Sequence, residues 1–217
     1  MRGFMMKVLL VNGSPNEKGC TYTALMEVAK TLNNEGIDTE FFWIGNKPVS
    51  GCIACYRCAV TGNCSIKDTV NEFRELADCV DGFIFGTPVY YASGNGSLIS
   101  FMDRVFFSEG WGNNGKAFFM KPAATVVSAR RAGTTAAFDQ INKYYTISQM
   151  PVVSSLYWNM VHGRTPEDVL KDGEGLYTMR ALGRNMAYML KCLEAGRNAG
   201  VPLPAEEESV VTDFIRD

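Results

Sequence analysis

The stretch from Lys7 to Thr23 is the feature that most constrains the fold. It starts with the unbroken apolar run 8–11 and then breaks at the turn sequence NGSP, which begins at Asn12. Such a run, rich in branched side chains and bounded by turn residues, is typical of a strand that is buried on both faces of a parallel sheet. Helix-forming residues follow from about Cys20, so we expect a strand, a polar loop and a helix in succession.

The loop between this strand and this helix is a candidate anion site. Free backbone N–H groups and the helix dipole favour negative charge at a helix N-terminus, and Ser14 and Thr21 add hydroxyl groups. The loop has neither the GxxxxGK[ST] pattern of a Walker loop nor the GxGxxG dinucleotide fingerprint. It therefore suits a single phosphate group. The alternative is an ordinary turn capped by serine or threonine.

Length and composition place the chain among soluble α/β domains. The 217 residues are 47% hydrophobic, and the net charge of −2 gives no reason to expect nucleic acid or an anionic membrane as a partner. No apolar run approaches the roughly 20 residues of a membrane span, and the N-terminus lacks the features of a signal peptide. We expect a cytoplasmic protein with one domain over residues 1–199 and a tail over 200–217.

Strand and helix patterns alternate along the chain. We expect strands over 5–12, 37–44, 82–86, 123–128 and 151–158, helices over 20–33, 68–79, 97–106, 133–148 and 176–199, and irregular structure over 108–121. This alternation predicts a parallel sheet with helices on both faces. Ligands of such sheets bind beyond the carboxyl ends of the strands, so the loops 12–21, 87–96 and 128–133 should form the site.

The second and third loops carry side chains that suit a flat, polar ligand. Tyr90 and Tyr91 offer aromatic faces, and Asn95 offers an amide. Arg130 and Arg131 could balance the charge of a reduced cofactor or of a nicotinamide phosphate. The alternatives are surface tyrosines at a turn and a solvated arginine pair.

Together, the segments GSPNEKGCTYT, TPVYYASGNGSLISFMDR and SARRAG resemble the NADPH-dependent FMN reductase family of flavodoxin-like proteins. The resemblance implies a five-stranded parallel sheet of order 2-1-3-4-5, bound FMN and a homo-oligomer. It also implies three sets of cofactor-binding residues: Ser14, Asn16, Cys20 and Thr21 at the phosphate, Pro88, Val89, Tyr90, Tyr91 and Asn95 along the isoalloxazine, and Ser128, Arg130 and Gly133 near its pyrimidine edge.

Four cysteines are clustered in the loop 46–65. Cys52, Cys55, Cys58 and Cys64 follow the pattern C-x2-C-x2-C-x5-C, and four thiolates this close in sequence can hold a [4Fe-4S] cubane or one tetrahedral metal ion. A disulfide framework is not expected in a reducing compartment. The pattern resembles the compact motif of iron-sulfur flavoproteins, a branch of the same family. The open alternatives are a [4Fe-4S] cluster, free thiols and zinc.

The resemblance implies an FMN-dependent oxidoreductase that takes hydride from NAD(P)H at flavin N5 and passes electrons to a small molecule or a redox protein. No side chain need act as a catalytic acid or base. One alternative is a non-enzymatic iron-sulfur flavoprotein that carries electrons from a ferredoxin-like partner, and another is a flavin-binding redox sensor. We also expect a homodimer or homotetramer in which Trp111 and its loop could cover a neighbour's flavin.

Overall fold

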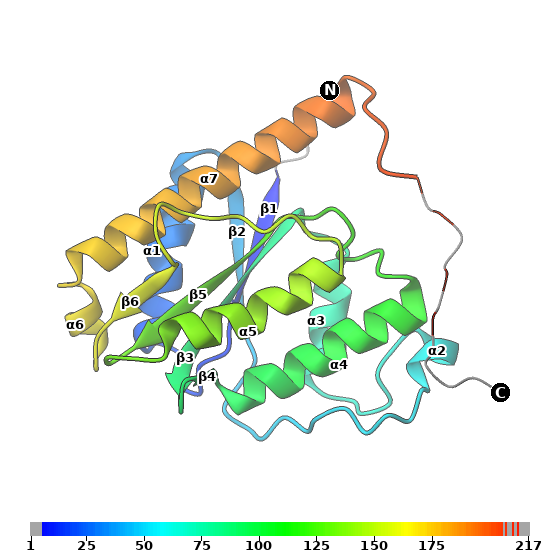
Figure 1. Cartoon of the computed structure of the whole chain (residues 1–217), viewed down its shortest axis with the longest axis horizontal. Coiled ribbons are helices and arrows are strands. Elements are labelled where there is room, and N and C mark those ends of the chain that lie inside the picture. Colours follow the sequence, from blue (N-terminus) through cyan, green and yellow to red (C-terminus); the bar gives the residue numbers. More distant parts are fainter. Residues whose placement is uncertain (1–5, 206, 208–209, 211, 213–217) are drawn as a thin grey trace.

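The computed structural model describes residues 6–205, 207, 210 and 212. The strands are β1 (Lys7–Asn12), β2 (Asp38–Trp43), β3 (Gly82–Tyr90), β4 (Ser93–Gly94), β5 (Ala123–Ala129) and β6 (Met160–His162). The helices are α1 (Cys20–Asn34), α2 (Cys58–Thr61), α3 (Thr69–Ala77), α4 (Gly96–Asn113), α5 (Thr134–Ile147), α6 (Pro166–Val169) and α7 (Gly173–Asn198) (Figure 1).

The main sheet has the strand order β2-β1-β3-β5-β6, and all of its neighbouring strands are parallel. Among the parallel strands of the described residues this is the order 2-1-3-4-5, so the predicted flavodoxin-like topology is confirmed. The additional strand β4 is antiparallel to β3 and lies off the path of the main sheet.

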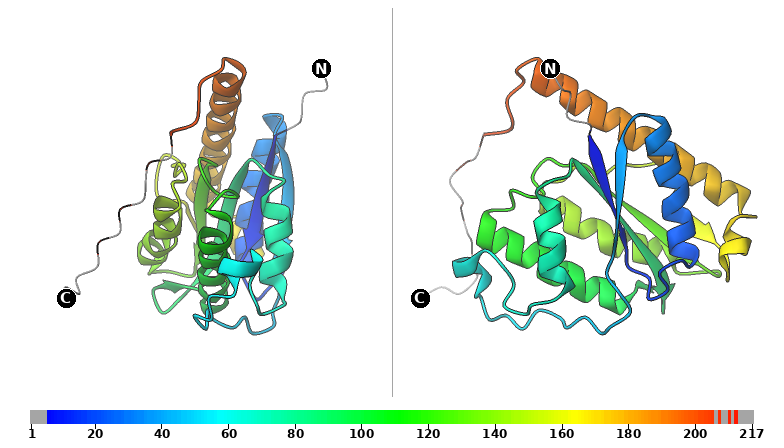
Figure 2. Two further views of the ribbon diagram at one scale, coloured as in Figure 1. Left: turned by 90° about the vertical axis from the view of Figure 1, so that its right-hand side faces the viewer. Right: turned by 180° about the vertical axis from the view of Figure 1, so that it is seen from behind.

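The helices cover both faces of this sheet, as Figures 1 and 2 show. Side chains alternate along β1: Leu9 and Val11 join a core with α3, α4 and α5, whereas Val8 and Leu10 join a core with α1 and α7. All four side chains are fully buried. The unbroken apolar run therefore has the predicted cause, because each face of the strand packs against a helical layer.

The last predicted strand, 151–158, is wrong in position. The strand that pairs with the end of β5 is Met160–His162, and the earlier segment contributes only an isolated bridge between Val152 and Ala123. Ala123 and Val127 are four residues apart on β5, but their partners Val152 and Met160 are eight apart, so the intervening chain bulges outward. Its apolar residues Leu156, Tyr157 and Trp158 are consequently exposed.

Other predicted boundaries also change. The strand predicted over 82–86 continues to Tyr90, and β4 forms within the predicted loop 87–96. The segment predicted to be irregular, 108–121, continues α4 as far as Asn113, where Asn114 ends the helix in a left-handed conformation. The final helix begins at Gly173, three residues before its predicted start, because the Asp172 side chain accepts a hydrogen bond from the Gly175 N–H. In the described part of the chain, we find no helix with both the length and the apolar character required to span a bilayer.

Candidate functional site

The side chains of Asn12, Ser14 and Trp43 fix the loop after β1 by hydrogen bonds to its backbone. The Asn12 side chain accepts from the Ser14 N–H at 3.0 Å and donates to the Glu17 carbonyl at 2.8 Å. The Trp43 indole, at the end of β2, donates to the Ser14 carbonyl at 2.8 Å. The Ser14 hydroxyl accepts from the backbone N–H of the exposed Asn16 at 3.1 Å. Bonds within the chain therefore fix the shape of this loop.

Two glycines allow this loop to approach β3. The Gly13 N–H donates to the Gly86 carbonyl at 2.8 Å, and a Cβ at Gly13 would lie 2.9 Å from that oxygen. A Cβ at Gly86 would lie 2.8 Å from the Thr21 and Leu25 side chains on α1. A larger residue at Gly86 would push the start of α1 away from β3, and one at Gly13 would push the loop away from β3 and from Leu98 of α4.

The N-terminus of α1 remains available to an anion. Its N-cap is Gly19, so no side chain caps the helix, and its first turn holds no acidic residue. Its first backbone N–H groups have no partner within the helix. The Cys20 thiol lies 3.7 Å from the Gly163 carbonyl, and burial raises the pKa of this thiol. Cys20 therefore adds no negative charge beside these N–H groups at neutral pH.

The hydroxyls of Thr21 and Ser128 join the first loop to the third. Their oxygens are 2.8 Å apart, and both residues are buried. Thr21 lies in the first turn of α1 and Ser128 near the end of β5. The structure therefore brings together two of the predicted loops through a direct side-chain contact.

The second loop is a tight hairpin between β3 and β4. Tyr91 and Ala92 form its turn with φ angles of 51° and 59°, as a two-residue type I′ turn requires. Gln140 of α5 fixes the hairpin by accepting from the Ser93 hydroxyl at 2.8 Å and from the Gly94 N–H at 3.0 Å. Tyr90 is 47% exposed and Tyr91 is fully exposed, so both rings lie on the rim of the strand ends.

The remaining residues predicted for the second loop are less exposed. Pro88 and Val89 are half-buried near the end of β3, whereas Asn95 is buried. The Asn95 side chain accepts from the Ser97 N–H at 2.7 Å and so caps α4. Its backbone N–H donates to the Thr87 hydroxyl at 2.9 Å. Asn95 thus supports the loop through the start of α4.

Gly133 brings the third loop against the second. Its φ angle is +95°, and a Cβ there would lie 2.8 Å from Ala92 Cα and 2.9 Å from a methyl carbon of Val89. Arg130 and Arg131 precede it and are exposed. All three predicted loops therefore meet at the carboxyl ends of β1, β3 and β5, as the strand order requires.

The four clustered cysteines line one cavity together with Arg104 and Phe107. Cys52 and Cys55 are exposed, Cys58 is buried at the start of α2, and Cys64 is partly buried. The chain turns sharply in this loop, since Ala54, Tyr56 and Gly62 have positive φ angles. A hydrogen bond with Ser65 at 3.2 Å lowers the pKa of the Cys55 thiol, whereas burial raises the pKa of the Cys58 thiol.

The spacing of these sulfurs bears on which metal group they fit. In the described residues, no three Cys, His, Asp or Glu side chains converge closely enough to hold a metal ion. A tetrahedral zinc site with bonds of about 2.3 Å requires sulfurs about 3.8 Å apart. A cubane takes one thiolate at each of its four irons, and the four thiols that line this cavity match that number.

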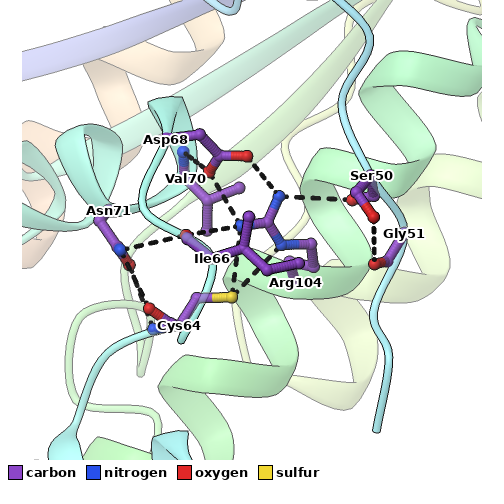
Figure 3. Close-up of polar contacts among 8 residues, drawn as sticks. All are labelled: Ser50, Gly51, Cys64, Ile66, Asp68, Val70, Asn71 and Arg104. Atoms are coloured by element: carbon purple, nitrogen blue, oxygen red, sulfur yellow. Dashed lines mark hydrogen bonds and ion pairs between the residues drawn. The ribbon is translucent and has the colours of Figure 1, made fainter. Parts of the chain in front are cut away.

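Arg104 on α4 binds both ends of the cysteine loop (Figure 3). Its guanidinium donates to both carboxylate oxygens of Asp68 at 2.7 and 2.8 Å, to the Ser50 carbonyl at 3.3 Å and to the Ile66 carbonyl at 2.9 Å. Its Nε and Nη2 also donate to the Cys64 sulfur, each at 3.3 Å. Burial opposes its charge, but these bonds to Asp68 and Cys64 leave the pKa of Arg104 raised.

Sequence reasoning missed three residues that build these loops: Asn12, Trp43 and Arg104. Asn12 is the polar residue that ends the apolar run of β1, and Trp43 ends the next strand. Arg104 is the clearest signal in retrospect, because it interrupts the apolar stripe that includes Phe101, Met102 and Val105. A charged side chain in such a stripe is buried only with partners.

Comparisons with known proteins agree with this architecture. The profile of the family described as NADPH-dependent FMN reductase matches residues 6–165. An iron-sulfur flavoprotein of Methanocaldococcus jannaschii is 32% identical over an alignment of 195 residues, which covers 87% of this chain and all of that protein.

Solved structures show the same fold at low sequence identity. RosB, crystallised with a bound riboflavin 5′-phosphate derivative, superposes with a TM-score of 0.69 at 14% identity over 98% of this chain and 94% of its own. A flavodoxin from the domain Archaea gives a TM-score of 0.55 at 15% identity over 86% of this chain and 99% of its own. On the family profile and the archaeal relative together, this chain belongs to the NADPH-dependent FMN reductase family and is related to its iron-sulfur flavoproteins.

Proposed function

We propose that this protein is an FMN-dependent oxidoreductase that uses NAD(P)H. The observation that carries the proposal is the meeting of three loops at the carboxyl ends of β1, β3 and β5, fixed by the Thr21–Ser128 hydrogen bond of 2.8 Å. When bound, FMN would supply hydride acceptance at N5 and onward electron transfer to a small molecule or a redox protein. The chain would bind the flavin, orient it and keep water from one side of the ring.

The first loop would hold the phosphate of FMN. The uncapped N-terminus of α1 offers backbone N–H groups, and Ser14 and Thr21 add hydroxyls beside it. Asn16 and Cys20 complete the proposed phosphate set. The raised pKa of Cys20 keeps its thiol neutral there, which avoids repulsion of the anion. A loop of this kind takes one phosphate, so we propose FMN rather than FAD as the cofactor.

The second and third loops would hold the ring. Pro88, Val89 and the two tyrosines form a rim at the end of β3, and Asn95 supports that rim by capping α4. Ser128, Arg130 and Gly133 would lie toward the pyrimidine edge, where a positive charge stabilises electron density on the reduced ring. These loops are connected to one another. The Thr21–Ser128 hydrogen bond connects the first loop to the third, and close packing of Gly133 on Ala92 connects the third to the second.

Two measurements on protein purified without air test this function. Heat-released cofactor should run as FMN on chromatography, and NADPH or NADH should be oxidised continuously when a quinone or free flavin is supplied. FAD in the released fraction would contradict the phosphate argument. Retained FMN without oxidation of either nucleotide would contradict the oxidoreductase proposal and favour a redox sensor.

The cysteine cavity favours a second candidate function, an iron-sulfur flavoprotein that carries electrons from a ferredoxin-like donor. Four free thiols around one cavity, with a buried cation beside one of them, suit a [4Fe-4S] cluster. Rapid reduction by a protein donor, without steady-state nucleotide oxidation, would distinguish the carrier from the enzyme. Cys55→Ser should remove the iron and leave FMN bound, and the exposed Cys192→Ser serves as the matched control.

We also propose that the protein acts as a homodimer or homotetramer. Trp111 is 57% exposed at the end of α4 and packs with Tyr56 of the cysteine loop, their ring centroids being 5.6 Å apart. A second copy could cover this aromatic pair. Light scattering at micromolar concentration tests the proposal, and a fully active monomer would contradict it.

A further inference from the structure

Arg104 is placed unusually for a charged residue. It lies in the middle of α4, and its side chain has no exposed surface. Neighbouring positions on the same helix, such as Phe101 and Val105, pack into the apolar core. A buried guanidinium is stable only if its donors are paired, so its partners reveal which feature of the molecule requires the charge.

Those partners all lie in or beside the cysteine loop. Asp68 neutralises the charge through two short hydrogen bonds, and its side chain remains 30% exposed. The guanidinium also donates to the carbonyl oxygens of Ser50 and Ile66. The remaining contact is with the sulfur of Cys64, which lies 3.3 Å from both Nε and Nη2 (Figure 3). Nη2 has two N–H groups and also faces Asp68 and Ile66, so its three acceptors share these two donors.

Hydrogen bonds to cluster sulfurs, the nearby net charge and solvent exposure set the reduction potential of an iron-sulfur cluster. Reduction adds one negative charge, and donors aimed at a ligating sulfur stabilise that extra charge. Cys64 would be the ligand that receives such donors from a permanently charged group. The cavity lined by all four cysteines contains the same guanidinium in its wall.

We propose that Arg104 raises, and Asp68 lowers, the reduction potential of a [4Fe-4S] cluster held by Cys52, Cys55, Cys58 and Cys64. This inference rests on the iron-sulfur candidate function above. In the step concerned, one electron passes to the oxidised cluster from the reduced flavin, or from dithionite in a titration, and no bond to carbon or hydrogen forms or breaks. Arg104 stays protonated throughout, so no proton accompanies the electron through it.

Asp68 also has a second role, which makes it a useful probe. Its side chain accepts from the Val70 N–H at 3.1 Å and so caps α3. Asparagine is an equally good N-cap, so Asp68→Asn removes the negative charge and keeps the cap. Loss of the Arg104 guanidinium should therefore lower the reduction potential of the cluster, and loss of the Asp68 charge should raise it. General damage to the loop would not produce shifts of opposite sign.

The test is a potentiometric titration of the reconstituted protein, followed by electron paramagnetic resonance for the cluster and by visible absorption for FMN. In Arg104→Lys the ammonium cannot reproduce the fork of the guanidinium. We expect the equilibrium constant for one-electron reduction of the cluster to fall about tenfold, which corresponds to 59 mV. Asp68→Asn should shift the potential upward. Lys67→Gln removes an exposed cation just beyond the loop 46–65, which solvent and salt screen, and should leave the potential unchanged.

The possible results separate this inference from the function on which it rests. Wild-type protein that takes up no iron or sulfide overturns the cluster and the inference together, whereas FMN binding is measured independently in the same sample. Variants that bind a full cluster at the wild-type potential overturn the inference alone. Loss of iron from both Arg104→Lys and Asp68→Asn, or an equal shift of the FMN potential, would assign these residues a purely structural role and also overturn it.

Discussion

The hydroxyl oxygens of Thr21 and Ser128 lie 2.8 Å apart in a buried contact between the start of α1 and the end of β5. Neither residue is near the other in sequence, and β3 lies between β1 and β5 in the sheet. The contact therefore crosses the middle strand on the α1 side and fixes the distance between the proposed phosphate loop and the proposed pyrimidine loop.

Thr21→Val should weaken FMN binding. It removes the hydroxyl that contacts Ser128 and that would reach the phosphate. A hydrogen bond to a charged group contributes roughly 1.5–3 kcal/mol, so affinity should fall about ten- to a hundredfold. Fluorescence titration with FMN measures the change. Ser128→Ala tests whether the effect depends on the pair, and Thr23→Val, which removes a hydroxyl bonded to the Gly19 carbonyl, is the control. Unchanged affinity would show that the Thr21 hydroxyl does not contact the phosphate and has only a structural role at the start of α1.

Gly133→Ala should destabilise the fold and distort the site. A left-handed conformation costs a residue with a side chain roughly 1–2 kcal/mol, and here the new methyl group would also meet Ala92 Cα at 2.8 Å. Gly115→Ala is the matched control, because Gly115 has a φ angle of +70° but open space around a Cβ. Urea unfolding should show a larger loss of unfolding free energy for Gly133→Ala. Equal losses would show that the close contact with the hairpin has no energetic consequence.

Trp43→Phe should loosen the first loop without emptying the core. It removes the indole N–H that bonds the Ser14 carbonyl at 2.8 Å. A neutral hydrogen bond contributes about 0.5–1.5 kcal/mol, so FMN affinity should fall by up to about tenfold. Trp158→Phe changes an exposed tryptophan outside this loop and should have no effect on affinity. A similar loss in both variants would argue against a local role of Trp43.

Ionisation of Cys20 should lower the free energy of unfolding as pH rises into the alkaline range. Burial raises the pKa of its thiol in the folded protein above the ordinary value of about 8.5. Folding therefore favours the neutral thiol. The contribution of Cys20 to the free energy of unfolding is fully present below the ordinary pKa, and it is lost as pH rises through the higher pKa of the folded protein. The difference in unfolding free energy between the wild type and Cys20→Ser should be constant near neutral pH and should shrink on the alkaline side.

Alkylation gives a direct measurement of the same group. In folded protein, the Cys20 peptide should react with iodoacetamide at higher pH than it does in urea, as followed by mass spectrometry. Identical pH profiles in the two states would contradict the shift.

Local sequence signals predicted the parts of the fold that local interactions determine. The unbroken apolar run 8–11 predicted β1, and it forms that strand. Alternation predicted a parallel sheet, and the family resemblance implied the order of its strands. The convergence of three loops followed from the parallel sheet, because parallel strands end at the same edge.

Contacts between distant residues could not be predicted in this way. The displaced β6 depends on the bulge between Val152 and Met160, which only the spacing of partners on β5 reveals. The partners of Arg104 are 36 to 54 residues away in sequence. A single sequence shows that a cation interrupts an apolar stripe, but it does not show which carboxylate or sulfur faces that cation.

The guanidinium of Arg104 joins Ser50 to Ile66 and Asp68, so the chain enters and leaves the cysteine loop at nearly the same point. The entropy cost of bringing the ends of a loop together grows only slowly with loop length. Extra residues between the ends that Arg104 holds should therefore cost little and leave the strands on either side in place. The segment that carries the cysteines is fastened to α4 rather than to the sheet, by Arg104 at its neck and by Asn113, which donates to the Gly62 carbonyl at 2.9 Å.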